Sequence, residues 1–222
     1  MAFKPALNAR IFRRLWRYCG AGYAFLWLLQ RLLGRVLPLR ILLIRVHDIK
    51  QLGDLPPQAP AGYRLAVPTP AEVDKDAFDD TAIRTGTFLR AAFERGDQLV
   101  AAYDEDRIVS YGWCAGQATP IFADLQIRFD PQYVYGYRAH TSKQHRGKGL
   151  HAAVIRHAGT TVAGAKGKGM VAFVDASNDR SLISEARAGD LNTGVVIAWT
   201  GKRLRYWASP LCRRVGLLLE RI

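Results

Sequence analysis

The spacing of apolar residues predicts where the chain forms helices and where it forms strands. Apolar side chains recur at helical spacing over residues 11–19, with four arginines on the opposite face, and an uncharged stretch follows at 18–30. Pro38 ends any helix there. The aliphatic and β-branched residues 39–46 fit either a strand or the tail of the helical region. Residues 53–62 are rich in Pro and Gly without periodicity, which is typical of a linker.

After the linker, short extended segments alternate with helical ones. Predicted strands lie at 63–67, 98–103, 108–115, 133–141, 171–175, 195–200 and 204–207. Predicted helices lie at 71–78, 82–95, 150–163 and 179–188. This order places one β-α-β crossover in a mostly antiparallel sheet, so the fold class is α/β or α+β. We therefore expect a basic amphipathic helical segment at 1–52, a linker at 53–62 and a mixed domain at 63–222.

Charge is distributed unevenly along the chain. The 222 residues include 32 Lys and Arg against 19 Asp and Glu, for a net charge of +13. Residues 1–50 hold 10 basic and 1 acidic side chains, residues 201–222 hold 6 and 1, and the middle is close to neutral. With 49% apolar and 23% charged residues, the composition excludes a disordered or collagen-like chain. The sequence indicates a globular middle with two basic ends.

The basic amino-terminal segment has three interpretations. As an interfacial anchor, its Trp and Leu side chains would enter the lipid boundary of an anionic membrane while its arginines meet the headgroups. As two helices packed on the domain, its arginines would be solvated. As a membrane-spanning helix it is short, because 13 uncharged residues in a row fall below the roughly 20 that a span needs. Nucleic-acid binding is less favoured, since no helix-turn-helix pattern accompanies the charge.

Cysteine and histidine spacing argues against disulfide or metal chemistry. Cys19, Cys114 and Cys212 lie far apart with no C-x-x-C pair, and the five histidines form no H-E-x-x-H motif. Free thiols suit a reducing compartment. We expect a cytoplasmic protein without a structural metal, held peripherally at the inner membrane face if its basic segment binds lipid.

A basic, glycine-containing loop separates the strand at 133–141 from the helix at 150–163. Residues 142–149 read Ser-Lys-Gln-His-Arg-Gly-Lys-Gly. Backbone N–H groups of such a loop and of the first helical turn can converge on an anion, and glycine lets phosphate oxygens come close. The residue order is neither that of a P-loop nor G-x-G-x-x-G. A plain strand-to-helix turn is the alternative.

Two elements of the sequence resemble the GNAT N-acyltransferase superfamily. Residues 144–149 match its Q/R-x-x-G-x-G/A signature between a strand and a helix, and Asn178 and Ser181, followed by Gly189, resemble its N-x-x-S…G element. The resemblance covers about residues 63–207. It implies a GNAT-like, mostly antiparallel sheet flanked by helices, and transfer of an acyl group, most simply acetyl, from acyl-coenzyme A to a primary amine by direct attack on the thioester.

The resemblance also implies where acyl-coenzyme A binds. The amides of residues 144–150 would hold the pyrophosphate, with charge added by the loop cations. The strand at 137–141 would pair with pantetheine like an added β-strand, and the amide near Thr141 would polarise the thioester carbonyl. The N-x-x-S pair would bond the pantetheine arm. The implied binding residues are Ala139, Thr141, Gln144, His145, Arg146, Gly147, Lys148, Gly149, Leu150, Asn178 and Ser181.

Several side chains are candidates for proton transfer. His140 lies on the strand beside the expected thioester, and an imidazole is a common general base for removal of an amine proton. A histidine bonded to a neighbouring strand is an equal alternative, and Asp175 is a weaker candidate base. Many family members carry a Tyr seven residues after the Asn as acid for the leaving thiolate, and this chain has Glu185 there. A glutamate could serve only if burial raised its pKa, so the general acid stays open.

The acceptor side is less defined by the sequence. Tyr111 and Trp113 alternate on a central strand and could line an acceptor pocket, although aromatic core is the more common fate. Asp190 replaces the Phe usual in the family, which would alter packing on the substrate side. We expect a small amine, an amino sugar or a lipid-linked amine as acceptor. Two alternatives are long-chain acyl transfer from an acyl carrier protein, whose acidic surface suits the basic ends, and a non-catalytic module that binds coenzyme A.

Overall fold

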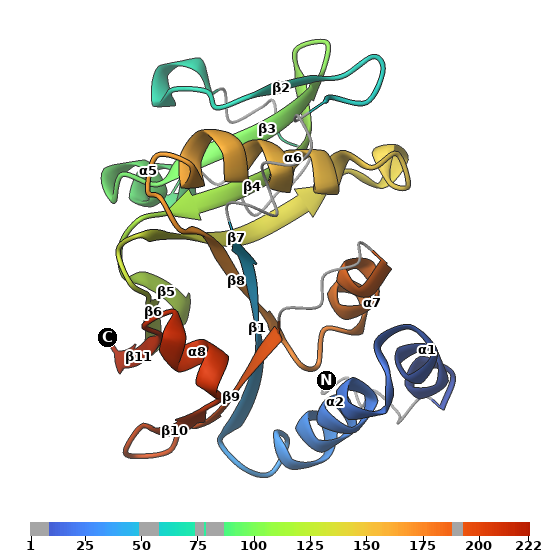
Figure 1. Cartoon of the computed structure of the whole chain (residues 1–222), viewed down its shortest axis with the longest axis vertical. Helices are drawn as coiled ribbons and strands as arrows, with labels where there is room; N and C mark the ends of the chain where they lie inside the picture. Colours follow the sequence, from blue (N-terminus) through green and yellow to red (C-terminus); the bar gives the residue numbers. More distant parts are fainter. Residues whose placement is uncertain (1–8, 49–57, 74–77, 79–86, 188–192) are drawn as a thin grey trace. The chain divides into compact units, whose positions relative to one another are not determined.

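The computed structural model describes residues 9–48, 58–73, 78, 87–187 and 193–222 (Figure 1). The chain divides into two compact units. Unit 1 comprises residues 1–45 and 173–221, and unit 2 comprises residues 46–172 with residue 222. Strands β1 and β8 pass from one unit into the other.

Unit 1 is built from a sheet and helices. Its elements are α1 (Ala9–Cys19), α2 (Ala21–Leu33), β1 (Leu39–Asp48), β8 (Gly169–Asp175), α7 (Asp179–Arg187), β9 (Thr193–Trp199), β10 (Arg205–Ala208), α8 (Pro210–Arg214) and β11 (Leu218–Arg221). The strands follow the hydrogen-bonded order β10-β9-β1-β8. β1 and β9 run antiparallel, with Leu39 opposite Trp199 and Arg45 opposite Thr193. The strand interpretation of residues 39–46 is therefore confirmed.

The amphipathic pattern of the first helix is confirmed by its packing. Leu15 of α1, Ala24 and Trp27 of α2, Leu43 of β1 and Leu182 of α7 share one hydrophobic cluster. The four arginines of α1 are exposed, as expected for the opposite face of an amphipathic helix. In the described part of the chain, no helix has the length and apolar character that crossing a bilayer demands.

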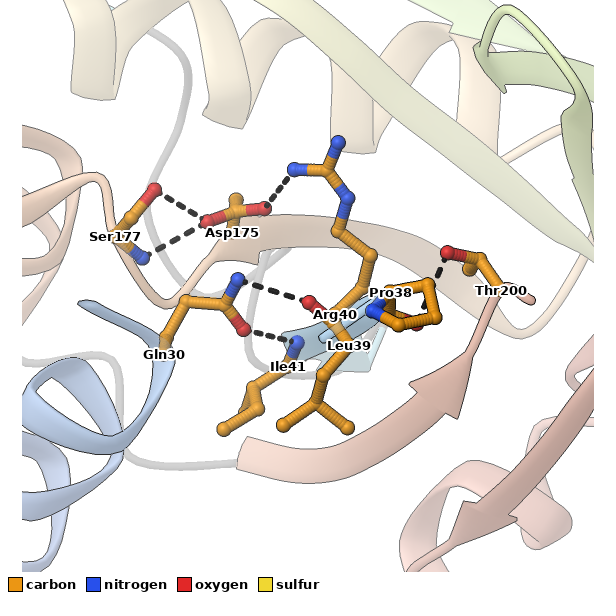
Figure 2. Close-up of polar contacts among 8 residues, drawn as sticks. All are labelled: Gln30, Pro38, Leu39, Arg40, Ile41, Asp175, Ser177 and Thr200. Carbon is orange, nitrogen blue, oxygen red and sulfur yellow. Dashed lines mark hydrogen bonds and ion pairs between the residues drawn. The ribbon is translucent and has the colours of Figure 1, made fainter. Parts of the chain in front are cut away.

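A buried side-chain amide joins α2 to the start of β1 (Figure 2). The side chain of Gln30, only 6% exposed, donates from Nε2 to the carbonyl of Leu39 at 3.1 Å and accepts the N–H of Ile41 at 2.7 Å. Nearby, Thr200 donates its N–H to the carbonyl of Pro38 at 2.6 Å. Of these groups the N–H of Ile41 is fully buried, and Gln30 gives it the partner that it would otherwise lack.

Unit 2 contains the predicted crossover. Its elements are β2 (Arg64–Ala66), a 3₁₀ turn (Pro70–Glu72), α5 (Thr87–Glu94), β3 (Gln98–Asp104), β4 (Arg107–Ala115), β5 (Thr119–Phe122), β6 (Leu125–Arg128), β7 (Tyr133–Thr141), a 3₁₀ turn (Lys143–His145) and α6 (Leu150–Ala158). The strand order is β8-β7-β4-β3-β2, antiparallel except for the parallel pair β7 and β8. The chain crosses from β7 through α6 to β8.

Hydrophobic clusters cover both faces of the sheet in unit 2. Leu150 and Val154 of α6 pack with residues such as Val100 on one face. Leu89 of α5 packs with Trp113 and other aromatic residues on the opposite face. Because successive residues of a strand point to opposite faces, both faces of β3 and β4 are apolar and their runs read as continuous hydrophobic segments.

The mixed, mostly antiparallel fold class predicted from the sequence is confirmed. The strand at 133–141 and the helix start at residue 150 have their predicted bounds, but α6 ends at Ala158 and continues as a π-helical turn, Gly159–Ala163. The sequence pattern did not indicate β5, β6, α8 or β11, which have only four or five residues each. The helix predicted at 71–78 is wrong in its described residues, because a 3₁₀ turn ends at Glu72 and Phe78 forms a β-bridge with Ile108. The predicted helix at 82–95 and the predicted linker at 53–62 lie partly outside the described residues.

Candidate functional site

One edge of β7 loses its strand partner halfway along. On one side β7 pairs with β4 from Tyr135 to Thr141. On the other side it pairs with β8 only from Tyr133 to Gly136. Within the described residues, positions 137–141 therefore have no neighbouring strand on that side. Backbone groups at such an edge can bond an extended ligand, as an added strand would.

A β-bulge on β7 decides which side chains share a face. Tyr111 of β4 lies opposite His140 and Trp113 lies opposite Tyr137, so Gly112 alone faces two residues, 138 and 139. Arg138 takes a positive φ of 49°, a left-handed conformation that costs a non-glycine residue roughly 1–3 kcal/mol. The extra residue places His140, rather than residue 139, on the same sheet face as Tyr137.

His140 is positioned by an aromatic neighbour. Its ring stacks on that of Tyr111, with centroids 5.7 Å apart and an interplanar angle of 27°. Tyr111 is 2% exposed and Trp113 is 1% exposed, and both belong to the hydrophobic cluster beneath α5. Their burial supports the aromatic-core interpretation, whereas His140 is half-buried.

Two glycines shape the backbone of the loop between β7 and α6. Gly147 and Gly149 have φ angles of 81° and 77°, both in the left-handed region. A Cβ atom built at either position meets no atom within 4 Å, so the loop is open on that side. Gly149 precedes α6, whose first-turn N–H groups lack intrahelical acceptors. Glycine is thus required here by conformation, and the open space leaves room for a ligand.

The hydroxyl of Tyr63 contacts two side chains of this loop, and no sequence pattern indicated this role. Its hydroxyl lies 2.7 Å from Nζ of Lys148 and 3.0 Å from Nδ1 of His145. His145 also lies 3.8 Å from a carboxylate oxygen of Asp104, so it is held by partners. Arg146 donates from Nε to the carbonyl of Thr141 at 3.0 Å. These bonds fix the loop between the strand and the helix.

Asn178 and Ser181 belong to unit 1, where they begin helix α7. The side-chain oxygen of Asn178 accepts the N–H of Ser181 at 3.2 Å, which is the bonding of a helix N-cap to its third residue. The N-x-x-S pattern therefore has a structural role of its own. Glu185 lies in α7, but its side chain is outside the described residues, as are Gly189 and Asp190.

Asp175 has structural partners. Its carboxylate accepts the N–H and the hydroxyl of Ser177 at 2.8 Å and 2.6 Å and lies 3.8 Å from Arg40 (Figure 2). These contacts shape the turn between β8 and α7. Asp175 is therefore already engaged in this turn.

A polar cluster that the sequence analysis missed lies where β7 loses its partner. The hydroxyl of Tyr137 donates to Asp97 at 2.7 Å, and Arg95 bonds the same carboxylate at 2.7 Å. Burial, and then the hydrogen bond to Asp97, raise the pKa of Tyr137, so its hydroxyl keeps its proton at neutral pH. Asp97 follows a helix stop at Gly96 and looks like a surface residue in the sequence.

Comparison with known proteins supports the fold. No family model matches the chain, and no curated protein matches it in sequence. A tandem GNAT protein from the clavulanic acid biosynthesis pathway is similar over 84% of this chain and 54% of that chain, with a TM-score of 0.50 and 15% identity.

Two more distant similarities are to an acetyltransferase from Trypanosoma brucei and a GCN5-related N-acetyltransferase from Sphaerobacter thermophilus. The first covers 58% of this chain and 92% of that chain, with a TM-score of 0.39 and 14% identity. The second covers 89% and 53%, with a TM-score of 0.38 and 16% identity. The similarity to the tandem protein shows that the chain has the GNAT fold, which the resemblance of the two sequence elements implied.

Proposed function

Starting from this GNAT fold, we propose that the protein is an acyltransferase that moves an acyl group, in the first instance acetyl, from acyl-coenzyme A to a primary amine. The observation that carries the proposal is the continuity of two features. The open edge of β7 at residues 137–141 leads directly into the glycine-bearing loop at the start of α6. An open strand edge that leads into such a loop suits a ligand with an extended arm that ends in a pyrophosphate.

The residues present fit this cosubstrate. Pantetheine carries two amides, which can bond the open edge of β7 as a strand would. The loop offers open space beside Gly147 and Gly149, the first N–H groups of α6, and positive charge from Lys148 and Arg146. The proposed binding set therefore keeps the loop residues 144–150 and the strand residues Ala139 and Thr141.

The proposed chemistry is direct attack of a neutral amine on the thioester. The strand N–H near Thr141 would polarise the thioester carbonyl, and binding along β7 would place it for attack. His140, half-buried and stacked on Tyr111, would take the amine proton.

Calorimetric titration with acetyl-coenzyme A tests the binding step. Gly147→Glu adds a carboxylate to the open side of the loop and strains a left-handed position, so we expect at least about a tenfold loss of affinity. Gly167→Glu is the matched control, because Gly167 also has a positive φ and open space, in a second basic glycine segment after α6. Equal loss in both variants, or no binding of any acyl-coenzyme A by wild type, would contradict the proposal.

Thiol release across a panel of amines then tests turnover. Small amines, amino sugars and lipid-linked amines are the acceptor classes to compare. Release only from an acylated carrier protein would favour the long-chain alternative, and binding without release would favour a non-catalytic module. A cytoplasmic location is part of the proposal and fits the three cysteines, which are free thiols.

A further inference from the structure

Exposed large hydrophobic side chains gather on unit 1. Within the described residues they are Trp16, Tyr18, Phe25, Leu32, Val36, Leu37, Trp199, Trp207, Leu218 and Ile222. Nine of these ten belong to unit 1, and six belong to α1, α2 and the turn that follows α2. Single exposed hydrophobic residues are normal on a protein surface, but a gathered set marks an interaction surface.

The outward face of α2 is apolar along its length. Phe25 and Leu32 are 59% and 45% exposed, and the half-buried Leu29 lies between them at helical spacing. The same helical face continues back to Ala21 and Gly22 and carries no charged residue. A helix on the surface of a globular domain usually presents polar residues on its outward face, so this apolar stripe indicates an interaction surface.

The stripe cannot turn inward, because the opposite face of α2 is fixed. Trp27 is 2% exposed within the core of unit 1, and Gln30 bonds the backbone of β1 at Leu39 and Ile41 (Figure 2). Rotating the helix to bury Phe25 would break both bonds and expose the indole of Trp27. The fold therefore holds the apolar stripe toward the outside.

Positive charge lies on the neighbouring helix. α1 packs beside α2 and exposes Arg10, Arg13, Arg14 and Arg17, with Trp16 56% exposed among them. The first 47 residues contain no Asp or Glu. Over its sequence, unit 1 holds 17 basic and 5 acidic residues, so it carries +12 of the chain's net +13.

We propose that the outward faces of α1 and α2 form a docking surface for an anionic lipid bilayer. The two helices lie along the membrane plane, with Trp16, Phe25 and Leu32 in the acyl boundary and the arginines of α1 at the lipid phosphates. An RNA or an acidic protein would pair with the arginines and leave the stripe of α2 without a partner. A second copy of the chain would cover the stripe and bring like charges together. The inference stands on this surface alone and does not depend on acyl transfer.

Vesicle flotation of the full-length protein tests the proposal. The probe is a set of vesicles of phosphatidylcholine with 30% phosphatidylglycerol, compared with vesicles of pure phosphatidylcholine. We expect binding to the anionic vesicles that weakens as salt rises, because salt screens the arginines. Absence of binding to the anionic vesicles at low salt overturns the proposal, whether or not the protein binds RNA.

Matched variants separate this surface from general charge. Arg13→Glu with Arg14→Glu should weaken vesicle binding by roughly thirtyfold or more, since each cation near an anionic surface contributes about a factor of five. Phe25→Ser with Leu32→Ser should weaken it by about tenfold. The control, Arg90→Glu with Lys166→Glu, makes the same change of net charge at exposed positions of unit 2 and should bind as wild type does. Equal loss in the control, or no loss in the α1 pair, overturns the proposal.

A spectroscopic readout makes the placement of the helices visible. Brominated lipid in the anionic vesicles should quench the fluorescence of Trp16, and a Trp16→Phe variant that still floats with the vesicles should lose that quenching. All substituted side chains are exposed, so circular dichroism should show wild-type folding. Vesicle binding without quenching at Trp16 contradicts insertion of this face.

Discussion

The amide of Gln30 provides a direct test of how α2 is fixed to the sheet. Gln30→Leu keeps a side chain of similar size and removes both hydrogen bonds to β1. The N–H of Ile41 then loses its acceptor. Because Ile41 is 0% exposed, this loss costs about 1–3 kcal/mol. The carbonyl of Leu39 belongs to a half-buried residue that water can reach, so losing the hydrogen bond to this carbonyl costs less free energy. We expect the free energy of unfolding to fall by about 2–3 kcal/mol.

Urea unfolding measures this loss as a lower transition midpoint. Gln98→Leu is the control, because Gln98 is exposed at the start of β3 and should leave the midpoint within about 0.5 kcal/mol of wild type. Faster hydrogen exchange at the Ile41 amide in the Gln30 variant would locate the effect. An unchanged midpoint and unchanged exchange would refute the inference that this amide fixes α2 and keeps its apolar stripe outward.

A Gln30→Glu variant adds a test through pH. The neutral acid can donate to Leu39 and accept from Ile41, whereas the carboxylate cannot donate and is costly to bury. Its folded-state pKa should lie above the unfolded value, so its stabilising contribution is present at low pH and is lost as pH rises. Relative to Gln30→Leu, the variant should therefore gain stability as pH falls from neutral. The same stability difference at every pH would refute the bonding.

Three further outcomes follow from other contacts. Tyr63→Phe removes the hydroxyl that orients Lys148, so calorimetry should show about a fivefold weaker affinity for acetyl-coenzyme A with little change in melting temperature. Burial raises the pKa of the Cys114 thiol to about 12, so a thiol reagent at pH 8 should modify Cys114 only after unfolding. The hydrogen bond from Lys168 lowers the pKa of Asp130 in the folded protein, so the Asp130 carboxylate stabilises the fold at pH values above its ordinary pKa. This contribution is lost as the pH falls. Urea midpoints of Asp130→Asn should therefore decrease less than those of wild type as the pH is lowered.

Local chemistry made the loop region predictable. The strand at 133–141 and the start of α6 have the bounds that the pattern indicated, because alternation, glycine and the helix start are set by neighbouring residues. The positive φ of Gly147 and Gly149 also agrees with the reason for placing glycine there. The fold class therefore follows from local patterns, whereas the GNAT fold was implied by the resemblance of residues 144–149 and 178–189 to that superfamily.

Features that depend on distant pairing were beyond the sequence. The bulge at Arg138 exists only in relation to the register of β4, and it decides that His140 shares a face with Tyr137. The bonds from Tyr63 to His145 and Lys148 join residues about 80 positions apart. No periodicity carries such information, because it arises when separate strands and helices are brought together.

The amino-terminal segment shows most clearly which features local sequence determines and which depend on tertiary packing. The sequence alone determined that residues 9–19 form a basic amphipathic helix and that an uncharged apolar stretch follows, because side-chain spacing and charge are local properties. Only the tertiary structure decided which face of α2 is buried, since Trp27 and Phe25 are equally apolar choices in the sequence. The packing of Trp27 in unit 1 and the bonds of Gln30 to β1 selected one face, and the apolar stripe of α2 was left on the surface.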